Sequence, residues 1–426
     1  MRGPKRGSLR FRRRGLLLHR DFLIYWTGES ISSIGSQVSG LAIPLTAVLL
    51  LHASEGQMGL LGAASSLPFA VIGLLSGVWV DRVRRRPLLI GVNLGQAALM
   101  GSIPLAALLD RLSMVQLYVV AFAVGSLVVV GTAAYQAFLP ALVGRRRLVE
   151  SNAKLQISES VAIVVGPSLG GLLVQWLTAP IAVAVDAISF IAAALGLLAV
   201  RRPEPPPRPA AERGSVVTEI REGLQTILGD PRLRLITLAG ATHNFFANGM
   251  IAALYVIYAV QTIGLSPAEL GLALAAGGPG VLIGAVLASR VPKRIGVGPA
   301  MAHMQTLTGL SRFVVAAAAT LAPPFALVAL MGGEFLLGVA RPIFNVTQVS
   351  LRQAVTPDRL LGRMNASIRF LMWVSVPVGG IAGGVVGTAF GLPVAMTIGA
   401  VGTLLAAIWL YLPSVWRIRV QPKPVR

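Results

Sequence analysis

The chain lacks cysteine altogether, and its 426 residues are poor in charge, in acidic groups and in histidine. Without cysteine it can form neither a disulfide bond nor a thiolate metal site, and it carries no indication of redox compartment. Only 12% of the residues are charged, whereas soluble proteins carry about 25%. Four histidines far apart and no clustered carboxylates leave little from which to assemble a catalytic or metal site. We therefore expect no enzyme, no metal and no cofactor.

Apolar sequence is what the chain has in excess. Apolar residues make up 55% of the chain, and the mean hydropathy is +0.75. Apolar runs of about 18 residues or more, long enough to cross a bilayer as helices, recur along nearly the whole length. The sequence predicts an all-α integral membrane protein with twelve transmembrane helices. They are expected near 22–51, 57–81, 87–109, 114–142, 155–177, 180–200, 233–262, 267–290, 298–321, 324–352, 364–389 and 393–412.

The positive charge is confined to one side of this predicted topology. The chain has 37 Lys and Arg against 16 Asp and Glu, a formal net charge of +21. All but four of the basic residues fall in the termini, in loops of one parity or at the adjoining helix ends. By the positive-inside rule, these segments lie in the cytoplasm of a plasma-membrane protein, with both termini. This distribution argues against nucleic acid as a partner and favours anionic membrane lipid. The four exceptions are Arg111, Arg312, Arg341 and Arg369.

A proline-rich polar segment divides the chain. It follows the sixth predicted helix and indicates a semi-rigid linker, and residues 215–229 within it are predicted to form an amphipathic helix on the membrane surface. The expected organisation is a basic tail, a six-helix bundle, a cytoplasmic linker, a second six-helix bundle and a second tail. The corresponding ranges are 1–21, 22–200, 201–232, 233–412 and 413–426.

The two halves show traces of an internal duplication. A shift of 213 residues places Gly166 on Gly379 and Gly170-Gly171 on Gly383-Gly384. A shift of 208 residues lays the basic turn at 82–86 over that at 290–294. Two matches at equivalent places with nearly equal shifts predict two six-helix pseudo-repeats. Parallel repeats that flank a midplane cavity are a transporter architecture.

The loop after the second predicted helix carries an aspartate beside a basic turn. This arrangement resembles the loop signature of the major facilitator superfamily, although Arg84 replaces its second glycine. In that superfamily the loop latches the two halves on the cytoplasmic side, with its aspartate at the N-terminus of the eleventh helix, where a carboxylate is stabilised. The alternative is a plain arginine anchor, which does not explain the aspartate. The residues of the predicted latch are Gly77, Asp81, Arg82, Arg85 and Arg86.

The fifth predicted helix places a proline among small residues. The segment resembles the motif of antiporters in the superfamily, with Ala162 at its leading glycine. Small residues let helices approach closely, and an internal proline bends a helix. Ordinary close packing explains the glycines equally well, so both interpretations stay open. The motif residues are Gly166, Pro167, Gly170 and Gly171.

Several charged residues fall inside predicted spans, where each costs about 2.5–3.5 kcal/mol on insertion scales. Arg312 on the ninth helix is expected to meet Glu334 on the tenth near mid-depth, either as a structural ion pair or as part of a functional site. Arg341 lies seven residues after Glu334, about 10 Å along the helix, which is too far for a direct pair.

A candidate proton and substrate site follows from the remaining polar residues. Glu29 lies on a first helix rich in serine that also carries Gln37, so part of that helix should line the cavity. Asp186 lies nearer the outer boundary, where hydration is an alternative to a proton-carrying role. On the seventh helix Asn244 and Asn248 mark the counterpart of the first. His243 is either a hydrogen-bonded core residue or a proton carrier.

Nearly the whole chain resembles the superfamily, and three segments are similar to the branch of macrolide-efflux and enterobactin-exporter proteins. The resemblance implies a monomeric exporter of amphipathic small molecules, working by alternating access in exchange for protons. The fourth helix lacks the arginine of many proton-coupled exporters, so coupling must use other residues. An importer of the same fold and a membrane-embedded enzyme or sensor are the alternatives, and substrate identity stays open. The three segments are Tyr135–Pro140, Asn345–Gln353 and Thr356–Ala366.

Overall fold

A computed structural model describes residues 19–73, 79–80, 82–144, 147–201 and 216–422. Within these ranges ten helices are long and apolar enough to cross a membrane. Two more helices, α2 (Glu55–Val71) and α14 (Val297–Ala317), occupy the other predicted positions. The described part of α2 is 17 residues long, and α14 is made more polar by His303, Gln305 and Arg312. The all-helical membrane fold is confirmed, and the count of twelve spans stays a prediction.

The helices of the first half are long, and short polar caps begin several of them. The Ser54 hydroxyl accepts from the backbone N–H of Gln57, whose side chain accepts from the Ser54 N–H in return, which satisfies donors that a helix start leaves free. Gly144 ends α5 at a φ of +76°, a conformation that glycine adopts without strain. Besides α2, the helices are α1 (Arg20–Leu49), α4 (Arg85–Leu108), α5 (Met114–Val143), α6 (Leu148–Trp176) and α7 (Ala179–Ala199).

The second half is more interrupted. Its first predicted helix is a series of α-helical and π-helical segments, and π-helical turns occur often at functional sites. The segments are α9 (Pro231–His243), η4 (Asn244–Ile251), α10 (Ala252–Ile257) and η5 (Tyr258–Thr262). Besides α14, the others are α11 (Pro267–Ala275), α12 (Gly277–Leu287), α13 (Val291–Ile295), η6 (Ala318–Thr320), α15 (Pro323–Val355), η7 (Asp358–Leu360), α16 (Leu361–Phe390), α17 (Leu392–Leu405), α18 (Ile408–Tyr411) and α19 (Pro413–Trp416).

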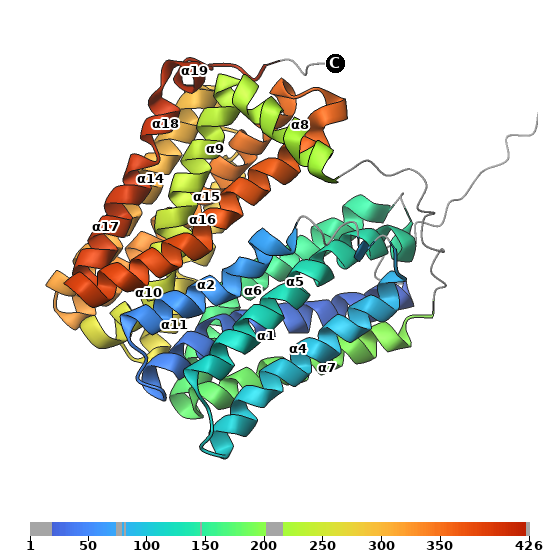
Figure 1. Ribbon diagram of the computed structural model, residues 1–426, viewed down its shortest axis with the longest axis vertical. Coiled ribbons are helices and arrows are strands. Elements are labelled where there is room, and N and C mark those ends of the chain that lie inside the picture. The colour runs from blue at the N-terminus through green and yellow to red at the C-terminus, as the bar shows by residue number, and fades with distance from the viewer. Residues whose placement is uncertain (1–18, 74–78, 81, 145–146, 202–215, 423–426) are drawn as a thin grey trace, which may run out of the picture.

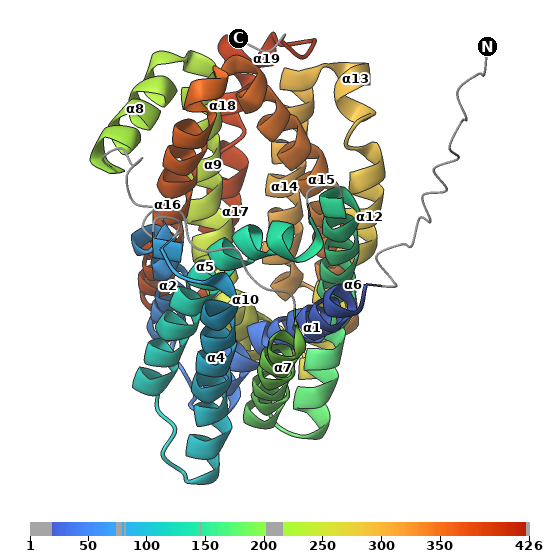
Figure 2. The ribbon, with the colours of Figure 1, turned by 90° about the vertical axis from the view of Figure 1, so that its right-hand side faces the viewer.

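The two halves form two groups of helices that meet at one end and diverge toward the other (Figures 1 and 2). The basic loops lie at the diverging ends, which we call the basic end. One buried apolar cluster joins both halves at the opposite end and includes Leu45, Tyr258 and Leu330. Toward the basic end the described residues form two separate clusters, one around Phe138 and the other around Ile236. The shared core therefore holds the halves together at the opposite end.

Glycines make the close helix crossings between the halves. On α16, Gly380 and Gly384 lie against α2, where Gly59 faces the Gly380 carbonyl. On α6, Gly171 lies against Pro267 and Gly271 of α11. Small residues allow two helix backbones to approach closely without side chains between them. These two crossings close the molecule at the end opposite the basic loops.

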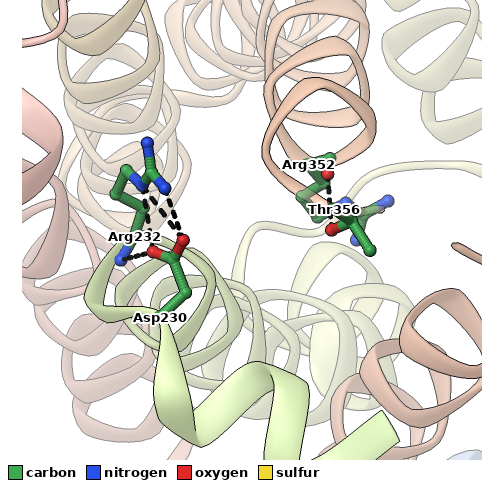
Figure 3. Close-up of polar contacts among 4 residues, drawn as sticks. All are labelled: Asp230, Arg232, Arg352 and Thr356. Carbon is green, nitrogen blue, oxygen red and sulfur yellow. Dashed lines mark hydrogen bonds and ion pairs between the residues drawn. The ribbon is translucent and has the colours of Figure 1, made fainter. Parts of the chain in front are cut away.

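The predicted amphipathic helix is present as α8 (Val216–Gly229). It packs on the start of α16, where Gly223 lies against Arg363 and Ser367, and Glu222 forms an ion pair with Arg363. Asp230 then caps α9 and binds Arg232 through both carboxylate oxygens (Figure 3). Burial raises the pKa of Asp230, but the hydrogen bonds and charge of Arg232 outweigh it and hold that pKa below its usual range.

Candidate functional site

A cavity of about 1090 Å³ lies between the two halves. Its wall runs from Ile43 and Met58, near the closed end, to Gly362 and Asn365 at the start of α16, near the basic end. The cavity thus follows the divergence of the helices seen in Figure 1. Its size suits a drug-sized molecule, since ligand sites commonly measure about 300–1,000 Å³.

The first half contributes an apolar wall with a few small polar groups. The serine-rich face of α1 reaches the cavity through Ser36 and Ser39, which confirms that part of this helix lines it. Gln96 of α4 adds an amide. Phe69 of α2 stacks on Trp373 of α16 with ring centroids 4.5 Å apart, so an aromatic pair bridges the halves. The apolar lining residues include Leu61, Met100, Val120, Val124, Val128 and Phe190.

The second half contributes amides and arginines. Asn244 and Asn248 lie on the π-helical segment η4 and both line the cavity, as expected. Asn248 Nδ2 donates to Asn244 Oδ1 at 2.7 Å, and Asn244 Nδ2 donates to the Met372 carbonyl of α16 at 2.8 Å. The hydrogen bonds fix the orientation of both amides. His243 lies outside this lining, with its Nδ1 3.2 Å from Gln305 Nε2 of α14.

The ion pair predicted between α14 and α15 is present. Arg312 Nη1 lies 2.8 Å from Glu334 Oε1, and both side chains are about one-tenth exposed. Arg341 lies seven residues after Glu334 on α15, and its exposed side chain lines the cavity. Arg341 and Glu334 form no ion pair with each other in the part of the chain that the structure describes, in agreement with their separation along the helix. The charges near this point are thus two arginines and one glutamate.

Glu29 lines a second, smaller cavity of about 370 Å³ inside the first half. It shares this space with Glu159 of α6 and Tyr135 of α5. Ser30 Oγ donates to Ser158 Oγ at 2.7 Å, and Trp26 Nε1 donates to the same oxygen at 3.0 Å. Ser36 and Gln96 line both cavities. Glu29 is therefore near the central cavity but faces a compartment of its own.

Asp186 is fully buried, which argues against the alternative that it is simply hydrated near the outer boundary. Its carboxylate fits against Gly35 in the middle of α1, where a Cβ would lie 2.5 Å from Asp186 Oδ1. Ser189 Oγ donates to Oδ1 at 3.0 Å. Oδ2 has no hydrogen-bond partner among the described residues. The sequence position alone did not reveal this burial, because it depends on how closely α7 packs on α1.

The antiporter-like motif of α6 packs against two different helices. Gly166 lies against Gln37 of α1, and Gly170 lies against Val38 of the same helix. Gly171 and Pro167 face α11 of the second half. The duplicated glycines of α16 make corresponding contacts, since Gly379 and Gly383 face η4 and Gly384 faces α2. Gln37 of α1 thus packs on α6 and lies outside the lining of the central cavity.

The predicted latch is only partly within the described residues. Gly77 and Asp81 lie outside them. Arg82 is exposed. Arg86 donates from Nε to the Leu197 carbonyl at 2.9 Å and from Nη2 to the Leu198 carbonyl at 2.8 Å. Arg86 therefore ties the first turn of α4 to the last turn of α7, where helix carbonyls need donors.

Sequence reasoning missed several residues of the cavity wall. By sequence, Arg352 belongs to the basic helix ends, yet it lines the cavity, and Arg369 lines it from α16. The missed signal was spacing: positions 341, 345, 348 and 352 fall on one face of a helix. The remaining unpredicted polar lining residues are Ser65, Ser66, Gln96, Asn345, Gln348 and Asn365.

Comparisons with known proteins agree with this architecture. Residues 16–421 match a family described as transmembrane secretion effectors. Macrolide efflux protein A of Streptococcus pyogenes is 24% identical over 414 residues, which cover 93% of this chain and 96% of that protein. Multidrug efflux pump Tap of Mycobacterium tuberculosis is 29% identical over 415 residues, 92% of this chain and 93% of the pump. Enterobactin exporter EntS of Citrobacter koseri is 25% identical over 369 residues, 86% of this chain and 84% of the exporter.

A solved structure shares the fold. It is a bacterial homologue of the human lysosomal transporter Spinster, in an inward-facing and unoccupied conformation. The two structures have a TM-score of 0.71 at 16% identity, with 94% of this chain and 98% of that chain covered. The chain thus belongs to the transmembrane secretion effector family of the major facilitator superfamily, and it is a multi-pass membrane transporter and not an enzyme.

Proposed function

We propose that this transporter exports amphipathic small molecules from the cytoplasm by alternating access, in exchange for protons. The observation that carries the proposal is the cavity of about 1090 Å³, which extends toward the basic end and is closed at the opposite end by the α2–α16 and α6–α11 crossings. The positive-inside rule assigns the basic end, with both termini, to the cytoplasm. A cavity open on that side receives its substrate from the cell interior.

The nature of the lining supports an amphipathic substrate. Apolar side chains from the first half face amides and arginines from the second. Three relatives are named for efflux or export, of macrolides, of several drugs and of enterobactin. We propose the same direction of transport for this chain. It is proposed to act as a monomer in the plasma membrane, in contact with membrane lipid.

Proton exchange is proposed to use carboxylates of the first half. Asp186 is buried with one oxygen unpartnered among the described residues, and it fits against the same helix whose Ser39 lines the cavity. Glu29 faces a compartment that shares Ser36 with the cavity. A carboxylate held out of water favours its protonated form until its surroundings change. Each is thus placed to couple a proton to the state of the cavity.

We also propose that the loop at 77–86 latches the basic end when the cavity opens on the other side. Support comes from its match to the superfamily motif and from Arg86, which joins the first turn of α4, directly after the loop, to the end of α7. The proposed partner, the start of α16, lies at the same end of the molecule and lines the mouth of the cavity through Gly362.

Transport in everted vesicles from a pump-deficient host tests the proposal. With an acidic interior, vesicles that contain the protein should accumulate a hydrophobic dye or a macrolide faster than vesicles without it, and an uncoupler should abolish the difference. If the uncoupler leaves the accumulation unchanged, transport is not driven by proton exchange, and that part of the proposal is wrong. Movement only in the opposite direction in oriented proteoliposomes would show an importer.

A further inference from the structure

The cavity wall is divided by charge between the two halves. The described lining residues of the first half are apolar or neutral, whereas α15 and α16 contribute three arginines, Arg341, Arg352 and Arg369. Among the described lining residues there is no aspartate and no glutamate. The charge that faces the cavity is therefore positive and comes from one side.

Within the part of the chain that the structure describes, the three guanidinium groups have no ion-pair partner of their own. No hydrogen bond or ion pair from the described residues reaches any of them, whereas Arg312 nearby is occupied by Glu334 at 2.8 Å. Arg352 is 9% exposed, and its Nε is buried without a partner. Figure 3 shows the contrast at the basic end, where Arg232 is held by both oxygens of Asp230 while Arg352 is joined to Thr356 only through its backbone carbonyl.

The positive groups form a continuous polar track. Arg341, Asn345, Gln348 and Arg352 are spaced four, three and four residues apart, so they share one face of α15. At 1.5 Å per residue the row extends about 16 Å along the helix. On α16, Asn365 and Arg369 form a second row at the same cavity. The track and the Asn244–Asn248 pair line the same cavity.

Unpaired guanidinium groups beside apolar surface are costly unless a ligand supplies the missing charge. A ligand that does so must also cover the apolar wall of the first half and the Phe69–Trp373 pair. We propose that the cavity selects amphipathic anions, with the carboxylate, sulfonate or phosphate group on Arg341, Arg352 and Arg369 and the apolar body against the first half. This assignment of substrate class rests on the proposed function, since it takes the cavity to be the transport site.

A matched series of fluorescent probes tests the charge preference. Dansylated undecanoic acid, its methyl ester and the corresponding dansylated undecylamine share one apolar body and carry negative, zero and positive charge. Binding is measured by dansyl emission on the full-length protein in nanodiscs of zwitterionic lipid. We expect the acid to bind about tenfold or more tightly than the ester, because a hydrogen bond to a charged group contributes that order. The amine should bind most weakly.

Arginine variants locate the effect. Arg341→Gln, Arg352→Gln and Arg369→Gln should each reduce the preference for the acid, and the triple variant should remove it. The corresponding Lys variants keep the charge and should keep the preference. Arg417→Gln is the matched control, since it removes one exposed basic charge at the same end outside the cavity lining. Equal binding of the three probes, or an acid preference that survives in the triple variant, would overturn the proposal.

Two further measurements distinguish lipid headgroups from soluble amphiphiles as the bound anion, and separate the proposed substrate class from the proposed function. Adding an anionic phospholipid to the nanodiscs displaces the acid if lipid headgroups occupy the site and leaves it bound if soluble amphiphiles do; both results agree with an anion site. Accumulation of neutral and cationic dyes in everted vesicles, without any preference for anions, would overturn the substrate class and leave the proposed function standing. Failure to move any probe would overturn the proposed function.

Discussion

At the scale of single residues, the buried charged groups differ in whether an oppositely charged partner lies beside them. Arg312 and Glu334 satisfy each other at 2.8 Å. Asp186 accepts a hydrogen bond from the Ser189 hydroxyl on Oδ1 and has no partner on Oδ2 in the described chain, and Glu29 faces a polar compartment with Glu159. A paired charge suits a structural role, while a lone carboxyl suits proton binding, because its environment favours neutralisation.

Asp186→Asn should separate proton coupling from folding and binding. The amide has nearly the same shape and carries no charge, so we expect the purified protein to melt at the same temperature or higher. Transport driven by a pH gradient should fall about tenfold or more, while exchange of labelled for unlabelled substrate without a gradient persists. Asp358→Asn, at an exposed position of the basic end, is the control.

Glu29→Gln is measured in parallel with the same assays. The carboxylate whose substitution abolishes gradient-driven transport is the proton carrier. If both variants keep full gradient-driven transport, neither residue carries the proton, and the proposed coupling site in the first half is wrong.

The ion pair between α14 and α15 allows a test of structural against functional roles. Arg312→Met leaves Glu334 buried and unpaired, which should cost about 3–5 kcal/mol of stability. Arg312→Met combined with Glu334→Met should recover most of that loss in thermal melts. If transport also returns in the double variant, the pair is structural; if stability returns without transport, it has a functional role.

At the scale of helices, close glycine contacts join the halves at the end opposite the basic loops. Gly59 of α2 and Gly384 of α16 allow backbones to touch, as do Gly171 of α6 and Gly271 of α11. The same pairs must separate if the cavity is to open on that side. The close packing that these glycines allow therefore stabilises the state in which the cavity is closed at that end.

Gly59→Ala should shift the equilibrium between states. The new Cβ would lie 2.5 Å from the Gly380 carbonyl oxygen, and overpacking of this kind costs about 1–3 kcal/mol, roughly tenfold in an equilibrium constant. We expect less maleimide labelling of Ser36→Cys, a cavity position, from the basic side. The natural absence of cysteine makes this a single-site measurement.

Gly91→Ala is the matched control, since a Cβ at Gly91 meets nothing within 4 Å. It should leave the labelling of Ser36→Cys unchanged. An equal decrease in both variants would mean that the effect comes from helix propensity and not from the contact between the halves.

At the scale of the whole molecule, one apolar core joins both halves at one end, and two separate clusters serve the other end. Such an arrangement permits the halves to rock about the shared core, which is what alternating access requires. The proposed latch acts at the diverging end, where it would hold the halves together in the state opposite to the one described.

Asp81→Asn should therefore slow transport more than it weakens binding. Asp81 lies outside the described residues, and its proposed role concerns closure of the basic end and not contact with substrate. In transport assays the maximal rate should fall several-fold with little change in the substrate concentration at half-maximal rate. Equal loss of rate and of affinity would contradict a latch.

The sequence by itself determined the membrane fold, the helix positions and the sidedness of charge, because these follow from hydropathy and from where lysine and arginine occur. It also predicted the Arg312–Glu334 contact, since the two residues lie at similar depth on successive antiparallel helices. Only the tertiary structure decided the burial of Asp186, the separate compartment of Glu29 and the convergence of Arg341, Arg352 and Arg369 on one cavity. Those depend on helix rotation and on glycine contacts between helices distant in the sequence, which hydropathy along one helix does not specify.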